Sequence, residues 1–371
     1  MRVFCLNILF AVFLATPSID ASPPDEFAQQ AAAKQPHKPI VATRDGLVQG
    51  VFEKDGRIAA FKGIPYAAPP TGALRWAPPA PPLPWEGVHD ASAFGPACPQ
   101  PPGMRQFGNE MLSRLGAPKG IIQALPREDE DCLSLNVWTP TLDANNAAPV
   151  LVWIHGGGYR MGGSAFDQSP ICNEGIVTVT FNMRLGVLGF FSHPALSKAS
   201  PTGTSGNQGL QDVVAVLEWV QENIAAFGGD PDRVTLGGLS AGGGAAALML
   251  GIPAAQGLFD GVIAISPAPV GFRHGLEPGI QGQHSAHAYG EMFAMGVGLG
   301  SDTTVEQLQA IPMNVLMGAQ MGMEAMLIHL DLPFTPRIDG AVIPKPVLDQ
   351  FALGATPDVP MLIGSATEDG G

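Results

Sequence analysis

The segment Gly238-Leu239-Ser240-Ala241-Gly242 has the Gly-x-Ser-x-Gly pattern of a nucleophilic serine. In such a segment a sharp turn between a strand and a helix exposes the serine, and the flanking glycines avoid clashes with neighbouring backbone. The pentapeptide also occurs by chance, so a glycine-rich turn with an idle serine is the alternative. Its context favours the nucleophile, because residues 234–236 are predicted to form a strand and residues 245–250 a helix.

A second glycine-rich segment, His155-Gly156-Gly157-Gly158-Tyr159, directly follows an apolar run at residues 150–154. Consecutive glycines let backbone N–H groups point at one spot, where each donor stabilises a tetrahedral oxyanion by about 3–4 kcal/mol in a serine protease. We assign the oxyanion hole to the N–H groups of Gly157, Gly158 and Ala241, the last at a helix N-terminus. A phosphate-binding loop is the competitor, but the Lys and Ser/Thr of that motif are absent.

Near the end of the sequence, Thr367-Glu368-Asp369-Gly370 supplies the acid that a serine nucleophile needs beside its histidine base. For a serine on such a turn, the triad runs Ser, then Asp or Glu, then His along the chain. The sequence has 8 histidines, and all of them precede Asp369. His155 lies inside the glycine-rich loop and is predicted to be structural. We therefore expect a truncated chain from which the general-base histidine is absent.

Apolar runs indicate the elements that must position these residues. Such runs, as expected for strands buried on both faces, occupy residues 135–138, 150–154, 176–181, 233–236, 261–265 and 361–363. Residues 209–227 carry apolar side chains at helical spacing and end at Gly228-Gly229-Asp230-Pro231. Strands that alternate with helices predict an α/β fold with a mainly parallel central sheet and flanking helices.

The remaining segments are predicted to surround this sheet. Residues 40–60, with two Asp-Gly pairs, predict N-terminal β-hairpins. Residues 65–102 are rich in proline and predict an ordered but irregular covering segment, and residues 103–128 predict a loop. Residues 285–330 contain helical patterns with many methionines. A methionine stripe more often belongs to a core than to a ligand surface, although a substrate gorge is the alternative here.

The N-terminus has the layout of a secretory signal peptide. Arg2 is followed by a nearly continuous apolar run to Ala15 and then by small residues around Ala21. That run is too short to span a bilayer core of about 30 Å. We therefore expect a signal peptide at residues 1–21, a flexible mature N-terminus at residues 22–39, and a secreted or periplasmic protein without a membrane anchor after cleavage.

Composition limits the partners. The 371 residues are 46% hydrophobic and 14% charged, which predicts a large packed core rather than global disorder. The net charge of −14 and the lack of a basic run argue against binding to nucleic acid or anionic membranes. The cysteines and histidines lack metal-site spacing, so no metal or organic cofactor is expected. Export permits disulfides, and Cys98, Cys132 and Cys172 remain after cleavage.

From about residue 40 to residue 371 the chain resembles the type-B carboxylesterases, the family of the cholinesterases and para-nitrobenzyl esterases. Many long motifs in the family's order carry this resemblance, namely residues 61–66, 97–100, 130–138, 182–186, 206–210 and the run 223–242. The resemblance implies an α/β-hydrolase fold, here without its C-terminal elements, in one domain at residues 40–371. It also implies a small-molecule carboxylic ester as the substrate.

The resemblance assigns roles to further residues. It implies one disulfide and two structural ion pairs, which are Cys98–Cys132, Arg75–Glu130 and Arg184–Asp212. Register against Gly364 and Gly370 makes Asp369 the triad acid, with Glu368 as the alternative. Ser266 lies where family members have a serine that supports this acid. Leu239 departs from the family, which often has Glu before the nucleophile.

Together these features predict a serine carboxylic-ester hydrolase that forms an acyl-enzyme on Ser240. Because the histidine is absent, we expect the chain to be a fragment or to be inactive alone. The alternative is a non-catalytic, cholinesterase-like binding or adhesion protein. The intact serine and oxyanion loop favour the enzyme, since a binding module needs neither.

Overall fold

A computed structural model describes residues 38–53, 56–114, 125–268, 275–276, 284–327 and 333–365. The predicted signal peptide at residues 1–21 lies outside the described residues. So do the candidate triad acids Asp369 and Glu368, and most of the predicted flexible segment at residues 22–39.

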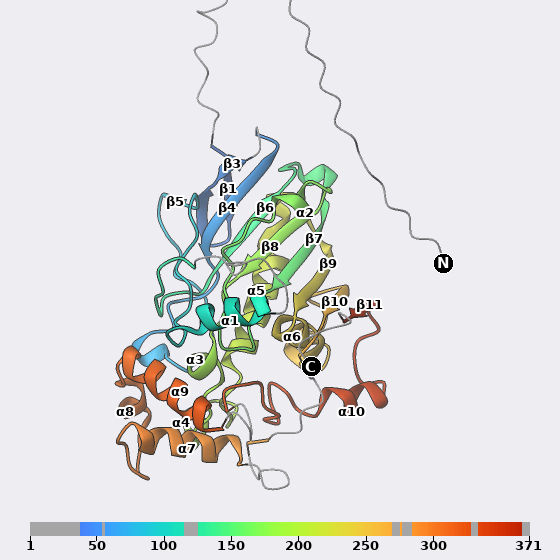
Figure 1. Cartoon of the computed structure of the whole chain (residues 1–371). Coiled ribbons are helices and arrows are strands. Elements are labelled where there is room, and N and C mark those ends of the chain that lie inside the picture. The colour runs from blue at the N-terminus through green and yellow to red at the C-terminus, as the bar shows by residue number, and fades with distance from the viewer. Residues whose placement is uncertain are drawn as a thin grey trace, which may run out of the picture. The chain divides into compact units, whose positions relative to one another are not determined.

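An eight-stranded sheet organises the described chain, with the strand order β11-β10-β9-β7-β8-β6-β4-β3 (Figure 1). Its strands are β3 (Val51–Glu53), β4 (Ile58–Pro65), β6 (Ser134–Thr139), β7 (Ala148–Ile154), β8 (Val177–Phe181), β9 (Gly229–Leu239), β10 (Gly261–Ile265) and β11 (Met361–Gly364). The strands from β8 through β7, β9 and β10 to β11 pair in parallel, and β6, β4 and β3 continue the sheet antiparallel. The predicted α/β fold with a mainly parallel sheet is confirmed.

The N-terminal hairpins are also confirmed. Strands β1 (Ile40–Thr43) and β2 (Gly46–Gln49) pair antiparallel, and β5 (Val88–Asp90) joins β2 in parallel. β3 and β4 form the second hairpin. Every residue of β6 and of β8 is buried, as the continuous apolar runs predicted for strands covered on both faces.

Helices cover the sheet and gather beyond one end of it. They are α1 (Met104–Arg114), α2 (Ser169–Cys172), α3 (Gly186–Phe190), α4 (Pro194–Ala199), α5 (Gln208–Asn223), α6 (Ala241–Met249), α7 (Ala286–Gly296), α8 (Val305–Gln309), α9 (Met313–Leu327) and α10 (Val347–Ala352). In Figure 1, α4, α7, α8 and α9 lie together at the lower end of the molecule. No helix in the described ranges is long and apolar enough to cross a bilayer.

Helix α5 confirms the helix predicted at residues 209–227. It continues as a 3-10 turn, η3 (Ile224–Phe227), and stops at Gly228, whose φ of 76° favours glycine. A Cβ built on Gly228 would lie 2.2 Å from the carbonyl oxygen of Thr141. Both the conformation and the close backbone therefore require glycine at this helix end.

Two predictions need correction. Residues 104–114 form helix α1 rather than part of a loop. The methionine-rich helices are present as α7 and α9, but only part of the methionine stripe is core, because Met317 and Met323 are buried whereas Met295 and Met326 are 61% and 63% exposed. These helices pack on one side only, so methionines on their other side face solvent.

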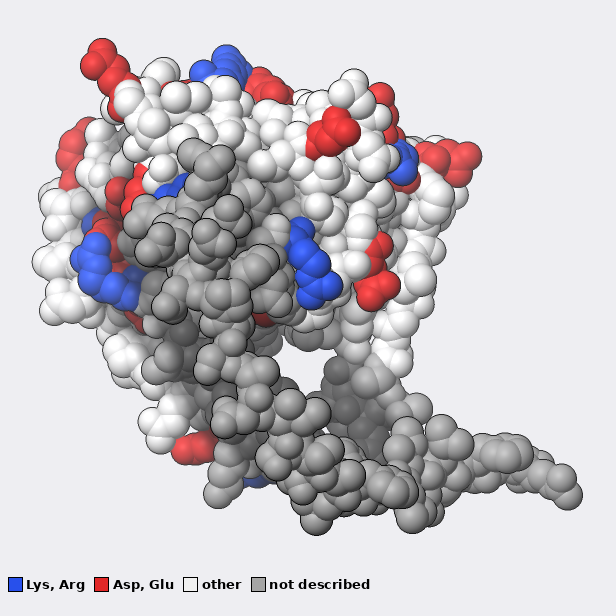
Figure 2. All heavy atoms as spheres, turned by 90° about the horizontal axis from the view of Figure 1, so that it is seen from above, with Lys and Arg blue, Asp and Glu red and all other residues white. Residues whose placement is uncertain are grey.

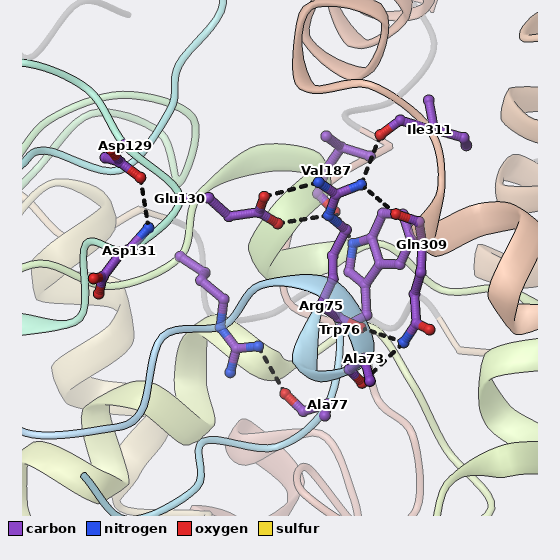
Figure 3. A network of polar contacts seen from close by, with 11 residues as sticks. Ala73, Arg75, Trp76, Ala77, Asp129, Glu130, Asp131, Val187, Gln309 and Ile311 are labelled. Atoms are coloured by element: carbon purple, nitrogen blue, oxygen red, sulfur yellow. Dashed lines mark hydrogen bonds and ion pairs between the residues drawn. The ribbon is translucent and has the colours of Figure 1, made fainter. Parts of the chain in front are cut away.

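The first implied ion pair, Arg75–Glu130, links three segments of the chain. Arg75 donates from Nε and Nη2 to the two carboxylate oxygens of Glu130, at 2.5 and 2.8 Å (Figure 3). Its Nη1 donates to the carbonyl oxygens of Gln309 at 2.8 Å and Ile311 at 2.7 Å. One guanidinium thus joins the proline-rich segment to the segment before β6 and to the turn between α8 and α9. The implied pair is confirmed.

The second implied ion pair is fully enclosed. Arg184 donates from Nε to Asp212 Oδ2 at 2.9 Å and from Nη2 to Oδ1 at 2.6 Å, and its backbone N–H donates to Oδ2 at 2.9 Å. The side chains are 3% and 0% exposed. Asp212 belongs to α5 and Arg184 lies two residues before α3, so the pair fixes α5 against the segment after β8.

The disulfide Cys98–Cys132 is confirmed, with a sequence separation of 34. A covalent link of this length restricts the unfolded chain and contributes about 3–4 kcal/mol in the chain-entropy picture. We expect Cys132→Ser to lower the free energy of unfolding by that amount in urea denaturation. The wild-type chain after reduction is the control and should match the variant. A loss below about 1 kcal/mol would contradict the expectation.

Cys172 is the free cysteine of the described residues, and it is buried. Burial, with a smaller contribution from Glu53, raises the pKa of its thiol to about 12. Because the thiolate is the reactive form, we expect the peptide that contains Cys172 to remain unmodified by a thiol reagent at pH 8 in the folded chain and to react in urea, as followed by mass spectrometry. Rapid modification of the folded chain would contradict this.

Most of the face that Figure 2 shows is uncharged. Acidic and basic side chains stand there singly or in small groups that often hold both signs. Over the described ranges, no group of three or more His, Cys, Asp or Glu side chains is arranged to hold a metal ion.

Candidate active site

Ser240 lies on the turn between β9 and α6, as the Gly-x-Ser-x-Gly pattern predicted. Its φ of 55° and ψ of −121° are unusual for a residue with a side chain. Three hydrogen bonds hold this conformation, because Ser240 N donates to Ile265 O and Ser240 O accepts from the N–H groups of Gly244 and Ala268, each at 2.9 Å. The residue itself is exposed, which is the geometry of an accessible nucleophile.

The two glycines of the motif are required by neighbouring backbone. A Cβ on Gly238 would lie 2.3 Å from the carbonyl carbon of Gly242, and a Cβ on Gly242 would lie 2.2 Å from the carbonyl oxygen of Ile154. Real Cβ atoms do not approach backbone so closely, so α6 sits against β7 and β9 only because both positions lack side chains. The two glycines of the Gly-x-Ser-x-Gly pattern are therefore explained by the close packing of backbone around the turn.

The glycine-rich loop after β7 lies against this turn. A Cβ on Gly156 would lie 3.4 Å from Ser240 Cβ. Gly157 and Gly158 have φ values of 125° and 64°, which glycine adopts without strain. The carbonyl of Gly157 accepts hydrogen bonds from the next residues along the loop, Arg160 and Met161, at 3.1 Å each. The structure thus brings the predicted oxyanion loop beside the predicted nucleophile, with Ala241 next to Ser240 in the chain.

Buried side chains hold the glycine-rich loop in place. Tyr159 has a φ of 61°, packs edge-on against Phe190 with ring centroids 5.3 Å apart, and accepts a hydrogen bond from Gly186 N at 2.7 Å. His155 Nδ1 lies 2.8 Å from the carbonyl oxygen of Gly156, and burial lowers the pKa of its imidazole. The loop is therefore fixed by its own aromatic residues.

The histidines in the described part of the chain make their contacts elsewhere than at Ser240. They bond to backbone, to Ser197 or to a neighbouring ring, and they are His89, His155, His193, His284 and His287. His155, although it shares the loop with the oxyanion glycines, bonds within that loop. No described histidine is hydrogen-bonded to the serine.

The strand that leads toward the candidate acids ends at the same edge of the sheet as Ser240. β11 pairs in parallel with β10, with Ile265 opposite Gly364. Ser266 follows β10 with a φ of 42°, and its N–H donates to Gly364 O at 2.6 Å. Because parallel strands end at one edge of a sheet, β11 is directed to the same edge as Ser240 and Ser266. Asp369 and Glu368 follow β11 outside the described residues.

Arg160 is a residue near the site that the sequence did not single out. Its Nε and Nη2 atoms each lie 3.6 Å from the position that a Cβ on Gly158 would occupy. Its Nη1 lies 3.3 Å from Oε2 of Glu324 on α9, a residue far away in the sequence. The one available signal was a charged residue two positions after the last loop glycine.

Comparison with known proteins agrees with this geometry. The model of the carboxylesterase family matches residues 37–371. The chain is 38% identical over 344 residues to fumonisin B1 esterase of Sphingopyxis macrogoltabida, covering 92% of this chain and 58% of that protein. It is 36% identical over 337 residues to para-nitrobenzyl esterase of Bacillus subtilis (strain 168), covering 89% of this chain and 63% of that protein.

Solved structures give the same result. A structure of PNB esterase is similar with a TM-score of 0.75 and 35% identity, covering 89% of this chain and 63% of that chain. The chain thus spans about three-fifths of the length of these relatives, with 58% and 63% of the two proteins named above. The sheet is that of an α/β-hydrolase, and the serine turn and glycine loop lie at its carboxyl edge. The chain belongs to the carboxylesterase family.

Proposed function

We propose that this protein hydrolyses small-molecule carboxylic esters through an acyl-enzyme on Ser240. The observation that carries this proposal is the exposed Ser240 at a φ of 55° with the glycine loop against it. The names of the relatives, which are esterases, support the same reaction class. A binding or adhesion protein on this fold needs neither the strained serine nor the glycine loop.

The reaction needs a base that takes the Ser240 proton as Oγ attacks the ester carbonyl carbon. The oxyanion then accepts hydrogen bonds from the N–H groups of Gly157, Gly158 and Ala241. The base returns the proton to the alcohol oxygen as the C–O bond breaks, and water hydrolyses the acyl-enzyme in the reverse manner. We assign orientation of the base to Asp369, with Glu368 as the alternative. The direction of β11 toward Ser266 supports this assignment.

We infer that the 371-residue polypeptide by itself turns over esters slowly. The reason is that Ser240 has no hydrogen-bonded histidine among the described residues. Loss of one triad member leaves about 10³–10⁴-fold catalysis over water in a model serine protease, supplied by the oxyanion hole and binding. We therefore expect a rate close to that supplied by the oxyanion hole and substrate binding alone.

The test is covalent labelling of Ser240 together with turnover. In a version of the protein extended at its C-terminus, we expect a fluorophosphonate to add one label, located at Ser240 by mass spectrometry, and none after Ser240→Ala. Hydrolysis of p-nitrophenyl acetate by the 371-residue polypeptide should be slow and lower still in Ser240→Ala. Absence of the label in the extended chain would favour the non-catalytic binding protein, and turnover of the 371-residue polypeptide at ordinary enzyme rates that Ser240→Ala abolishes would contradict the inferred slow turnover.

We also propose that residues 1–21 are a signal peptide and that the mature protein, with a flexible segment to residue 39 and one domain from residue 40, is secreted or periplasmic. The charged start and apolar run of the sequence support this. N-terminal sequencing of the protein recovered outside the cytoplasm should begin near residue 22. An N-terminus at Met1 in that fraction would contradict the proposal.

A further inference from the structure

Arg160 lies beside the oxyanion loop, next to Gly158. Its guanidinium lies over Gly158, with Nε and Nη2 each 3.6 Å from the Cβ position of that glycine. Gly158 is one of the proposed oxyanion donors, so a carbonyl group held there would lie next to the guanidinium. The Arg160 side chain is 24% exposed, so part of it is reachable from solvent.

The hydrogen-bonding capacity of Arg160 is largely unused. Its Nε is buried and has no hydrogen-bond partner, and its Nη1 makes a single contact of 3.3 Å to Glu324. Arg75 and Arg184, by contrast, each bind a carboxylate through Nε and Nη2 at distances from 2.5 to 2.9 Å. A buried charged donor without a hydrogen-bond acceptor costs free energy, and a ligand that accepts its hydrogen bond removes that cost. Arg160 therefore has the properties of a site prepared for an anion.

Glu324 holds Arg160 in place without saturating it. Gln320, which is fully buried, accepts a hydrogen bond from Val187 N at 3.0 Å and donates to Glu324 Oε1 at 2.9 Å. The other carboxylate oxygen, Oε2, faces Arg160. Burial raises the pKa of the Glu324 carboxyl, against the effect of Arg160. The position of the guanidinium is thus fixed from α9, while its remaining N–H groups stay free to bind.

We propose that Arg160 binds a carboxylate of the substrate, so that the enzyme prefers monoesters of short dicarboxylic acids over uncharged esters. This inference rests on the proposed function, because the oxyanion glycine beside Arg160 defines where the ester carbonyl lies. The planar guanidinium fork matches a carboxylate in a bidentate manner. A spacer of a few carbons joins the ester carbonyl and the carboxylate in such substrates, in keeping with the proximity of Arg160 to Gly158.

The carboxylate of Glu324 competes with a substrate carboxylate for Arg160. Glu324 occupies Nη1 and places a negative charge near the incoming carboxylate. Replacement of Glu324 by Gln keeps the shape and the bond to Gln320 but removes that charge. If Arg160 serves only to hold α9, Glu324→Gln should not change the affinity for carboxylates. If Arg160 binds an anion, the variant should bind carboxylates more tightly.

The experiment measures binding, which does not depend on turnover. The full-length Ser240→Ala chain is titrated with mono-4-nitrophenyl glutarate and, as the uncharged counterpart, with 4-nitrophenyl valerate, by calorimetry. We expect the glutarate monoester to bind about tenfold more tightly, since a charge-assisted hydrogen bond is worth at least that ratio. Adding Arg160→Gln should reduce the ratio to about onefold, Arg160→Lys should keep part of it, and Glu324→Gln should increase it.

Arg44→Gln is the matched control, because Arg44 also pairs with one glutamate, Glu222, but is exposed at the surface. It should leave the ratio unchanged. Unchanged binding of the valerate ester shows that the Arg160 variants are folded. Equal binding of the two esters, or a preference that survives Arg160→Gln, overturns the proposal. A preference that depends on Arg160, together with a Ser240 that resists fluorophosphonate in the chain extended at its C-terminus, would leave this inference standing and refute the esterase proposal; a labelled Ser240 without the preference would do the reverse.

Discussion

Replacement of Asp212 by alanine is expected to lower the free energy of unfolding by about 3–5 kcal/mol. Asp212 is 0% exposed and accepts hydrogen bonds from Nε, Nη2 and the backbone N–H of Arg184. Without it, the Arg184 guanidinium is left buried with Ala77 O as its remaining partner. The desolvation of an uncompensated charge, rather than the lost attraction, produces most of the effect. Urea denaturation with unchanged slope provides the measurement.

The exposed pair of Arg44 and Glu222 is the control for this experiment. Its side chains are 66% and 46% exposed, so Glu222→Ala should cost less than about 1 kcal/mol. The double variant Arg184→Met with Asp212→Leu should recover much of the loss, because it removes both buried charges. If Asp212→Ala lowered the free energy of unfolding as little as Glu222→Ala, the expectation that the buried ion pair stabilises the fold would be wrong.

The second large effect is expected from Gly242→Ala. The added Cβ would lie 2.2 Å from Ile154 O and 2.7 Å from His155 O, and both atoms belong to backbone that cannot rotate away. Helix α6 must then move from β7, which disturbs Ser240 and the oxyanion loop together. We expect a loss of about 3 kcal/mol or more, measured by urea denaturation. In the chain extended at its C-terminus, we also expect no fluorophosphonate label on Ser240, measured by mass spectrometry.

Gly318→Ala is the matched control, since Gly318 lies inside helix α9 and a Cβ there meets nothing within 4 Å. Alanine favours a helix over glycine by about 1 kcal/mol, so this variant should be neutral or more stable. A Gly242→Ala chain that is as stable and as readily labelled as Gly318→Ala would show that the close packing of the turn is not required.

The parts of the fold that the sequence predicted are those that leave local traces. The buried strands appear as continuous apolar runs because residues on both faces must be apolar, and the glycines of the serine turn appear because backbone excludes any Cβ. Helix α1 was missed because Gly108 and the polar residues around it suggested a loop, although Met104, Phe107 and Met111 lie at helical spacing. A short apolar stripe interrupted by glycine is easily overlooked.

The candidate site divides in the same way. Ser240 and the loop glycines could be identified because each belongs to a short motif in one stretch of chain. The contact of Arg160 with Glu324 could not be predicted, because 164 residues separate the two and nothing in the sequence around either residue indicates the other. Such pairs are set by how α9 packs against α3, which becomes visible only when the helices are placed.

The strand order determines when, during synthesis, each part of the site can form. β7, β8, β9 and β10, together with α6, are all complete once residue 265 has been made. Because the chain is made from its N-terminus, the segments of the serine turn and of its oxyanion loop are available on the nascent chain before the rest of the domain. Glu324 emerges later and β11 later still. The segments that carry the nucleophile are therefore synthesised before the residues that orient Arg160 and before the strand that leads to the acid.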